Sequence, residues 1–154
     1  MQHTTPDRSW VGVKKILVVS DFRSGQIVIP ELTAESLCKR VQSIAFDGSP
    51  VPVSCTRIGD PHLADADAAV LTVQAAVREP SASNPMLVYV IRRHRIGGLE
   101  PGPVYFGSGP QAVPLSNPVN FGAIDAAFRQ SLGEILPWLN GSETQLKSTR
   151  QRGE

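Results

Sequence analysis

The sequence predicts an α+β fold, in which a single-layer sheet of about four to five strands has two helices packed on one face. Residues 68–95 contain two apolar runs rich in β-branched residues, joined by the turn formers PSASNP, which is typical of an antiparallel hairpin. Two other segments repeat apolar residues at helical spacing. The expected order, β-α-β-β-β-(β)-α, lacks the regular alternation of a doubly wound fold and predicts an antiparallel or mixed sheet.

The first part of the chain predicts a strand, a helix and a second strand. The segment KKILVVSDF, residues 14–22, is a continuous apolar run and is typical of an interior strand. Thr33 is a suitable N-cap for a helix over residues 33–46, and Gly48 provides a left-handed residue after its end. The segment VPVSCTRI, residues 51–58, is a second strand, which Pro52 places at a sheet edge because proline has no N–H.

The last part of the chain predicts short extended pieces and a closing helix. The short pieces are expected at residues 104–106 and within residues 111–118. Asn120 is a good N-cap, and after it apolar residues form a helical stripe as far as Leu139. Pro137 is expected to end or kink this helix.

The domain organisation is expected to be simple. A chain of 154 residues is long enough to bury a sizeable core without a metal. We expect a loose N-terminal arm at residues 1–10, a single domain over residues 11–140 and a polar, disordered tail at residues 141–154, because the tail lacks apolar periodicity.

Composition limits the classes of partner and the compartment. The formal net charge of +1 argues against a nucleic-acid binder, since such proteins are usually strongly basic. No apolar run reaches the roughly 18 residues of a membrane span. The first ten residues lack the apolar region of a signal peptide. We therefore expect a cytoplasmic protein if Met1 is the native start, or a periplasmic one if Met1 replaces a removed signal.

The two cysteines, Cys38 and Cys55, lie on a predicted helix and on the strand that follows it. A helix packed on that strand would bring them together, so a disulfide and two buried thiols are both compatible with the sequence. Nothing in the sequence marks an oxidising compartment, and the expectation is therefore two reduced thiols.

An acidic loop at residues 59–67 contains candidate metal ligands. Carboxylate and imidazole groups close together can bind a divalent metal, and the candidates here are Asp60, His62 and Asp65. The alternative is a solvated loop in which Asp60 forms an Asx turn. No other cofactor is predicted.

Two short segments resemble parts of the metallophosphoesterases. They are VVSDF around Asp21 and IGDPH around Asp60, since that family pairs an Asp-x-His on a first strand with a later Gly-Asp. The resemblance implies a small metal-dependent hydrolase that uses Asp21, Asp60 and His62. The sequence departs from the family at Arg23, which stands in the place of the histidine and cannot bind a metal, and it lacks the later Gly-Asn-His segment.

A basic cluster ends the predicted hairpin. Alternation places Arg92 on one face of the strand and Arg93, Arg95 and Tyr89 on the other. Arginines two residues apart can bind a phosphate or carboxylate, and an aromatic ring nearby can stack on a base. This predicts an anion or nucleic-acid site, and the alternative is a charged strand end that prevents pairing with other chains.

The sequence contains little that indicates an enzyme. No nucleophile motif such as Gly-x-Ser-x-Gly is present, and His62 and His94 are the candidate general bases. We therefore expect a non-enzymatic binding or assembly module that uses an exposed sheet face or edge and binds a protein partner or a second copy of itself. The order of elements is similar to that of the small N-terminal domains of TolB-like and curli-secretion-like periplasmic proteins.

Overall fold

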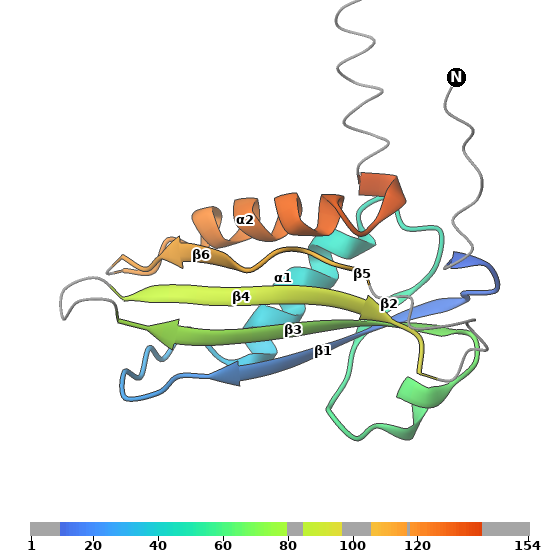
Figure 1. Ribbon diagram of the computed structural model, residues 1–154, viewed down its shortest axis with the longest axis horizontal. Coiled ribbons are helices and arrows are strands. Elements are labelled where there is room, and N and C mark those ends of the chain that lie inside the picture. Colours follow the sequence, from blue (N-terminus) through green and yellow to red (C-terminus); the bar gives the residue numbers. More distant parts are fainter. Residues whose placement is uncertain (1–9, 80–84, 97–105, 117, 140–154) are drawn as a thin grey trace, which may run out of the picture.

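The computed structural model describes residues 10–79, 85–96, 106–116 and 118–139, which form one mixed sheet with two helices on one face (Figure 1). This confirms the predicted fold class. The elements, in chain order, are β1 (Lys15–Arg23), α1 (Ala34–Phe46), β2 (Val53–Cys55), the short 3₁₀ helix η2 (Pro61–Ala64), β3 (Ala68–Arg78), β4 (Met86–His94), β5 (Phe106–Gly107), β6 (Gln111–Pro114) and α2 (Phe121–Gly133).

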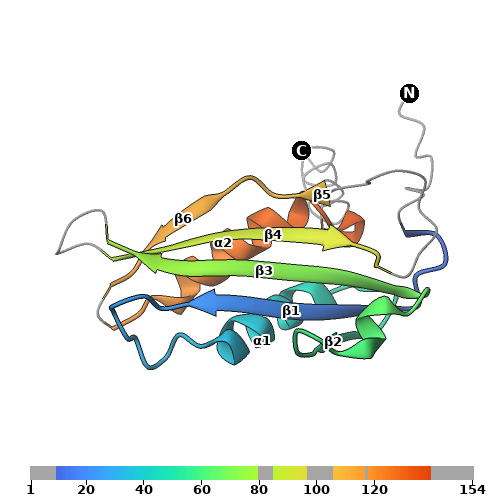
Figure 2. The same cartoon turned by 60° about the horizontal axis from the view of Figure 1, so that its bottom comes forward.

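The sheet has the order β2-β1-β3-β4, and the short strands β5 and β6 both pair with the outer side of β4 (Figure 2). Strand β1 is parallel to β2 and to β3, with Ile16 opposite Val53 on one side and Ala69 on the other. Strands β3 and β4 form the predicted antiparallel hairpin, with Val73 opposite Ile91. The sequence did not indicate that β1 lies between β2 and β3, which are consecutive in the chain and do not pair.

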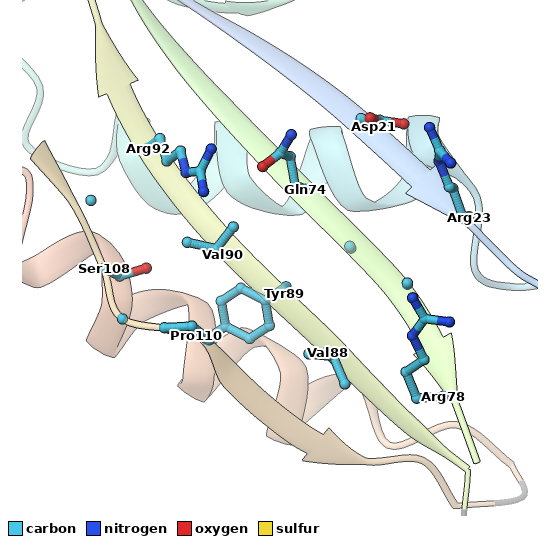
Figure 3. A pocket seen from close by; sticks show the side chains of 14 residues that line it. Asp21, Arg23, Gln74, Arg78, Val88, Tyr89, Val90, Arg92, Ser108 and Pro110 are labelled. Carbon is cyan, nitrogen blue, oxygen red and sulfur yellow. The ribbon is translucent and has the colours of Figure 1, made fainter. Parts of the chain in front are cut away.

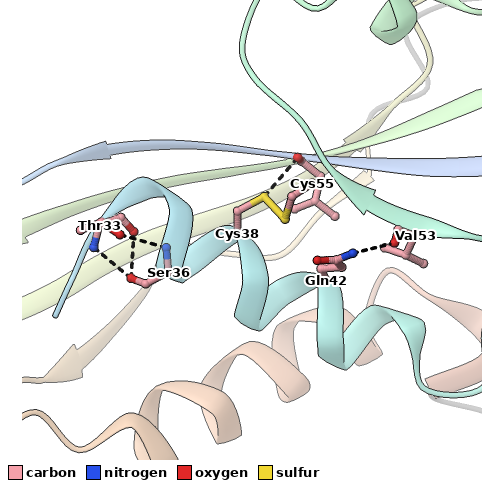
Figure 4. The surroundings of a disulfide bond; sticks show 7 residues. Thr33, Ser36, Cys38, Gln42, Val53 and Cys55 are labelled. Carbon is pink, nitrogen blue, oxygen red and sulfur yellow. Dashed lines mark hydrogen bonds between the residues drawn. A yellow bond between two sulfur atoms is a disulfide. The ribbon is translucent and has the colours of Figure 1, made fainter.

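Local signals explain where α1 begins and ends. The Thr33 hydroxyl accepts a hydrogen bond from the Ser36 N–H at 3.0 Å, and the Ser36 hydroxyl accepts one from the Thr33 N–H at 2.9 Å (Figure 4). This reciprocal capping satisfies two donors at the start of the helix. Beyond Phe46 the chain turns at Gly48, whose φ of 79° favours glycine. The predicted limits of this helix are confirmed.

The core lies between the sheet and the two helices. Alternate residues of β1, β3 and β4 point into it, and so do the apolar faces of α1 and α2. Tyr89 of β4 packs edge-on against Phe128 of α2, with ring centroids 4.8 Å apart, and its hydroxyl bonds that of Ser131 at 2.8 Å. Helix α2 begins after Asn120 as predicted but ends at Gly133, before Pro137, and Leu136 remains buried beyond its end.

Cys38 and Cys55 form a disulfide, so the expectation of two reduced thiols is wrong (Figure 4). Cys38 is on the face of α1 that packs on the sheet, and Cys55 is the last residue of the edge strand β2. Their Cα atoms are 6.0 Å apart, within the range that a disulfide spans. The sequence indicated that the two cysteines could meet, but it did not indicate that they are oxidised.

The predicted arm and tail fall largely outside the described residues. Trp10, the first described residue, packs edge-on against Trp138 with ring centroids 5.1 Å apart. Among the helices that the structure describes, none is long and apolar enough to cross a membrane.

We expect Phe128→Ala to lower the free energy of unfolding by about 3–5 kcal/mol, because it removes a fully buried ring at the centre of the core. Urea denaturation followed by circular dichroism would measure the change. The matched control is Gln130→Ala on the exposed side of α2, with an expected change within about 0.5 kcal/mol. Equal effects of the two substitutions would contradict this packing.

We expect the loss of the disulfide to lower the free energy of unfolding by about 3 kcal/mol, because the bond closes a short loop in the unfolded chain. The comparison is between the oxidised protein, the reduced protein and Cys38→Ala/Cys55→Ala in urea denaturation. Identical midpoints for the oxidised and reduced proteins would contradict the expected stabilisation.

Candidate binding surface

The sheet face opposite the helices is covered along only part of its length. At the amino end of β1, Leu17 and Val19 are buried on this face, together with Val70 of β3. The segment over residues 56–67, which contains η2, lies on this end of the sheet and packs on β3 (Figure 2). A 2.5 Å ion pair between Lys15 and Asp65 holds it there. Toward the other end of β1, no part of the described chain forms such a layer.

A shallow hollow of about 720 Å³ occupies the uncovered part of this face (Figure 3). Side chains from three neighbouring strands and from residues 107–110 line it. The register explains how they meet, because Gln74 on β3 is opposite Asp21 on β1 and Val90 on β4. One step further along, Ala76 is opposite Arg23 and Val88 in the same way.

The uncovered face divides into two strips of different chemistry. The charged strip lies on β1 and β3 and consists of Asp21, Arg23, Gln74 and Arg78. The apolar strip lies on β4 and β6 and consists of Met86, Val88, Val90, Ala112 and Pro114, all half-buried or exposed. An apolar strip beside arginines has the composition of a protein interface, since arginine and methionine are enriched there.

The arginines of the charged strip are free to meet a partner. Arg23 is opposite Ala76, and Arg78 is two residues further along β3, so the two arginines are diagonal neighbours on the same face. Within the described residues, the side chains of Asp21, Arg23 and Arg78 form no hydrogen bond or ion pair. Three positive charges line the hollow, including that of Arg92, against the single negative charge of Asp21.

The predicted anion-binding residues do not lie on one surface. Arg92 lines the hollow on the uncovered face. Arg93 is fully buried on the helix face, as is Tyr89, and its guanidinium group lies 5.0 Å from the centre of the Trp10 ring. Arg95 donates hydrogen bonds to the backbone carbonyls of Val11, at 2.8 Å, and Ala66. The alternation in the sequence separated Arg92 from Arg93, but it did not indicate which face is buried.

The acidic loop uses its carboxylates to hold its own conformation. Asp60 accepts hydrogen bonds from the Thr56 hydroxyl and from the His62 backbone N–H, and both lower its pKa. Hydrogen bonds from Lys15 and then His62 lower the pKa of Asp65. Asp60 thus forms the Asx turn that the sequence offered as an alternative, and the described residues contain no group of three acidic, histidine or cysteine side chains placed to hold a metal.

The residues of the hydrolase alternative do not form one metal-binding group. Asp60 is bonded to the Thr56 hydroxyl and to the His62 backbone N–H. Asp21, in contrast, lines the hollow on the uncovered face. Among the residues that the structure describes, Asp21 belongs to no group of three acidic, histidine or cysteine side chains that could hold a metal.

His94 lies at the covered end of β4 and is half-buried. Its Nε2 is 3.1 Å from the Thr72 hydroxyl oxygen. Burial lowers the pKa of His94, and the positive charges of Arg93 and Arg92 lower it further. These effects favour the neutral imidazole in the folded protein.

We expect His94 to destabilise the fold on acidification. Below about pH 6.5 the unfolded chain protonates this histidine, whereas the folded protein resists the proton, so stability falls with pH until the lowered folded pKa is reached. Urea denaturation at about pH 7 and about pH 5 would measure the effect. Between these two pH values, the free energy of unfolding should fall less for His94→Gln than for the wild type. Equal losses would contradict the lowered pKa.

Comparisons with known proteins show similarity of fold. No family model matches the chain, and no curated protein matches it. A PelC dodecamer from Paraburkholderia phytofirmans is 11% identical with a TM-score of 0.52, covering 83% of this chain and 91% of that one. A point variant of that dodecamer is 10% identical with a TM-score of 0.51, covering 81% and 89%. The hypothetical protein CT253 from Chlamydia trachomatis is 9% identical with a TM-score of 0.44, covering 82% and 98%.

Proposed function

We propose that this chain is a non-enzymatic assembly module that self-associates, with a second copy of the chain seated on the uncovered part of the sheet face. The observation that supports this most directly is the apolar strip along β4 and β6. Val88 and Val90 are only half-buried, whereas Leu87, Tyr89 and Ile91 on the other face of the same strand are buried under the helices. A second copy would remove this apolar surface from water, which favours association.

The face is a better interface than either edge of the sheet. At β2, the side-chain amide of Gln42 donates a 2.9 Å hydrogen bond to the Val53 carbonyl, and Pro52 offers no N–H. At the other edge, β6 spans only Gln111–Pro114 and ends in a proline. Short strands, prolines and capped carbonyls all oppose the addition of another strand.

The comparisons support self-association of this fold. PelC, which has a similar fold at a TM-score of 0.52, forms a dodecamer in its solved structures. The charged strip also supports it, because arginines around an apolar centre are typical of residues that contribute strongly to interfaces. A protein partner other than a second copy is the alternative, and the experiment below distinguishes the two.

We further infer that the chain works in an oxidising compartment, which favours the periplasmic alternative over the cytoplasmic one. The disulfide supports this inference, since such bonds are rare where thiols are kept reduced. Alkylation of free thiols at the moment of cell lysis, read by mass spectrometry, should label neither cysteine. Complete labelling of both would contradict the inference.

We expect the wild-type protein to associate in a concentration-dependent way in sedimentation velocity. Val88→Asp and Val90→Asp each place a charge in the apolar strip and should weaken association about tenfold or more, because the contact would bury that charge without a partner. Both positions are half-buried, so circular dichroism should show an unchanged fold.

The matched control is Gln130→Asp, which adds the same charge on the exposed side of α2 and should leave association unchanged. A wild-type protein that is monomeric at every concentration would contradict self-association. Association that survives both substitutions would contradict the assignment to this face.

A further inference from the structure

A second hollow, of about 460 Å³, lies on the helix side of the sheet. It opens beside the disulfide, which is drawn in Figure 4. It lies where β1 and β2 end and where α1 begins, the position at which parallel strands commonly place a ligand. Both cysteines line it. Ser20 of β1 and the charged residues Glu35, Lys39 and Arg57 also lie in its walls. The disulfide is therefore part of a surface that a small molecule can approach.

The two cysteines differ in how far they can be reached. Cys38 is 4% exposed on the packed face of α1, whereas Cys55 is half-buried at the end of the edge strand. Attack on a disulfide requires access to the sulfur that is attacked, and this favours Cys55. The Cys38 sulfur lies 3.2 Å from the Val18 carbonyl oxygen, so a thiol at this position has an acceptor in place. The core can thus hold Cys38 in its reduced form.

The charges around the hollow favour an anion. Lys39 and Arg57 are both exposed in its walls, and Glu35 is the one acidic side chain among the lining residues. The first turn of α1, which includes Ala34, adds the positive end of the helix dipole. A negatively charged reagent is therefore concentrated near the disulfide, and a positively charged one is repelled.

We propose that this hollow is a site of thiol–disulfide exchange, at which a small thiol bearing a carboxylate reacts with Cys55. The attacking thiolate forms a bond to the Cys55 sulfur while the bond between Cys55 and Cys38 breaks. The electron pair leaves with the Cys38 sulfur, which takes a proton from water. The products are a mixed disulfide on Cys55 and a thiol at Cys38, and attack by the Cys38 thiolate on the mixed disulfide reverses the step.

The experiment uses the full chain in its oxidised form and two probe thiols. Glutathione carries carboxylates in addition to its thiolate, and 2-mercaptoethanol carries no charge other than that of its thiolate. Intact-mass measurements follow adduct formation in time, and peptide mapping locates the adduct. We expect a glutathione adduct on Cys55 in protein that stays folded by circular dichroism. The rate should rise with thiol concentration, because the thiol attacks the folded protein directly and unfolding is not the rate-limiting step.

Charge reversal in the walls tests the recognition of the anion. Lys39→Glu/Arg57→Glu should slow the reaction with glutathione by roughly threefold to tenfold and slow 2-mercaptoethanol less. Both thiols attack as thiolates, but the glutathione thiolate carries the additional negative charge of its carboxylates. Lys14→Glu is the control. Lys14 is an exposed lysine that directly precedes the first residue of β1, and it does not line the hollow.

Four results would overturn the proposal. They are an adduct on Cys38, a rate that does not depend on thiol concentration, no adduct at all in the folded protein, and equal slowing of both thiols by the charge reversal. Self-association is measured separately, so its outcome does not affect this test.

Discussion

The parallel pairing of β1 with both β2 and β3 is the constraint on which the rest of this structure depends. Parallel neighbours need crossover connections, so the chain must leave the sheet twice. The first crossover is α1, on the face that the helices cover, and the second is the segment over residues 56–67, on the opposite face. Because β2 pairs only with Ile16–Val18, the second crossover returns over the first half of β1 and leaves the second half of that face uncovered.

The sequence predicted local secondary structure better than it predicted which elements pair or pack together. The hairpin, the two helix caps and the edge position of β2 each follow from a few adjacent residues, such as Thr33 with Ser36 or the missing N–H of Pro52. The continuous apolar run of β1 predicted burial on both faces, but it contains no information about which strands are its neighbours. The disulfide was missed for a different reason. The order of helix and strand already indicated that Cys38 and Cys55 could meet, but the sequence contains nothing that marks an oxidising compartment.

The binding surface could be predicted only in part. Alternation correctly separated Arg92 from Arg93, yet both faces of β4 are apolar over most of their length, with Leu87 and Ile91 on one side and Val88 and Val90 on the other. Which face the helices cover therefore cannot be read from the strand itself. The acidic loop contained residue types that suit a metal, but the same carboxylates suit turn formation, and the contacts of Asp60 and Asp65 are those of a turn.

Both hollows arise from the shortness of β2. Beyond Val18, no strand in the described part of the chain pairs with β1 on the β2 side. Side chains alternate between the two faces of β1 there, so Ser20 lies in the wall of the disulfide hollow and Asp21 in the charged strip. The disulfide joins α1 to β2, whereas the apolar strip lies on β4 and β6, on the far side of β1 and β3. Opening the disulfide therefore leaves the hydrogen bonds between β3 and β4 in place, and exchange at Cys55 and association through the open face should be energetically independent.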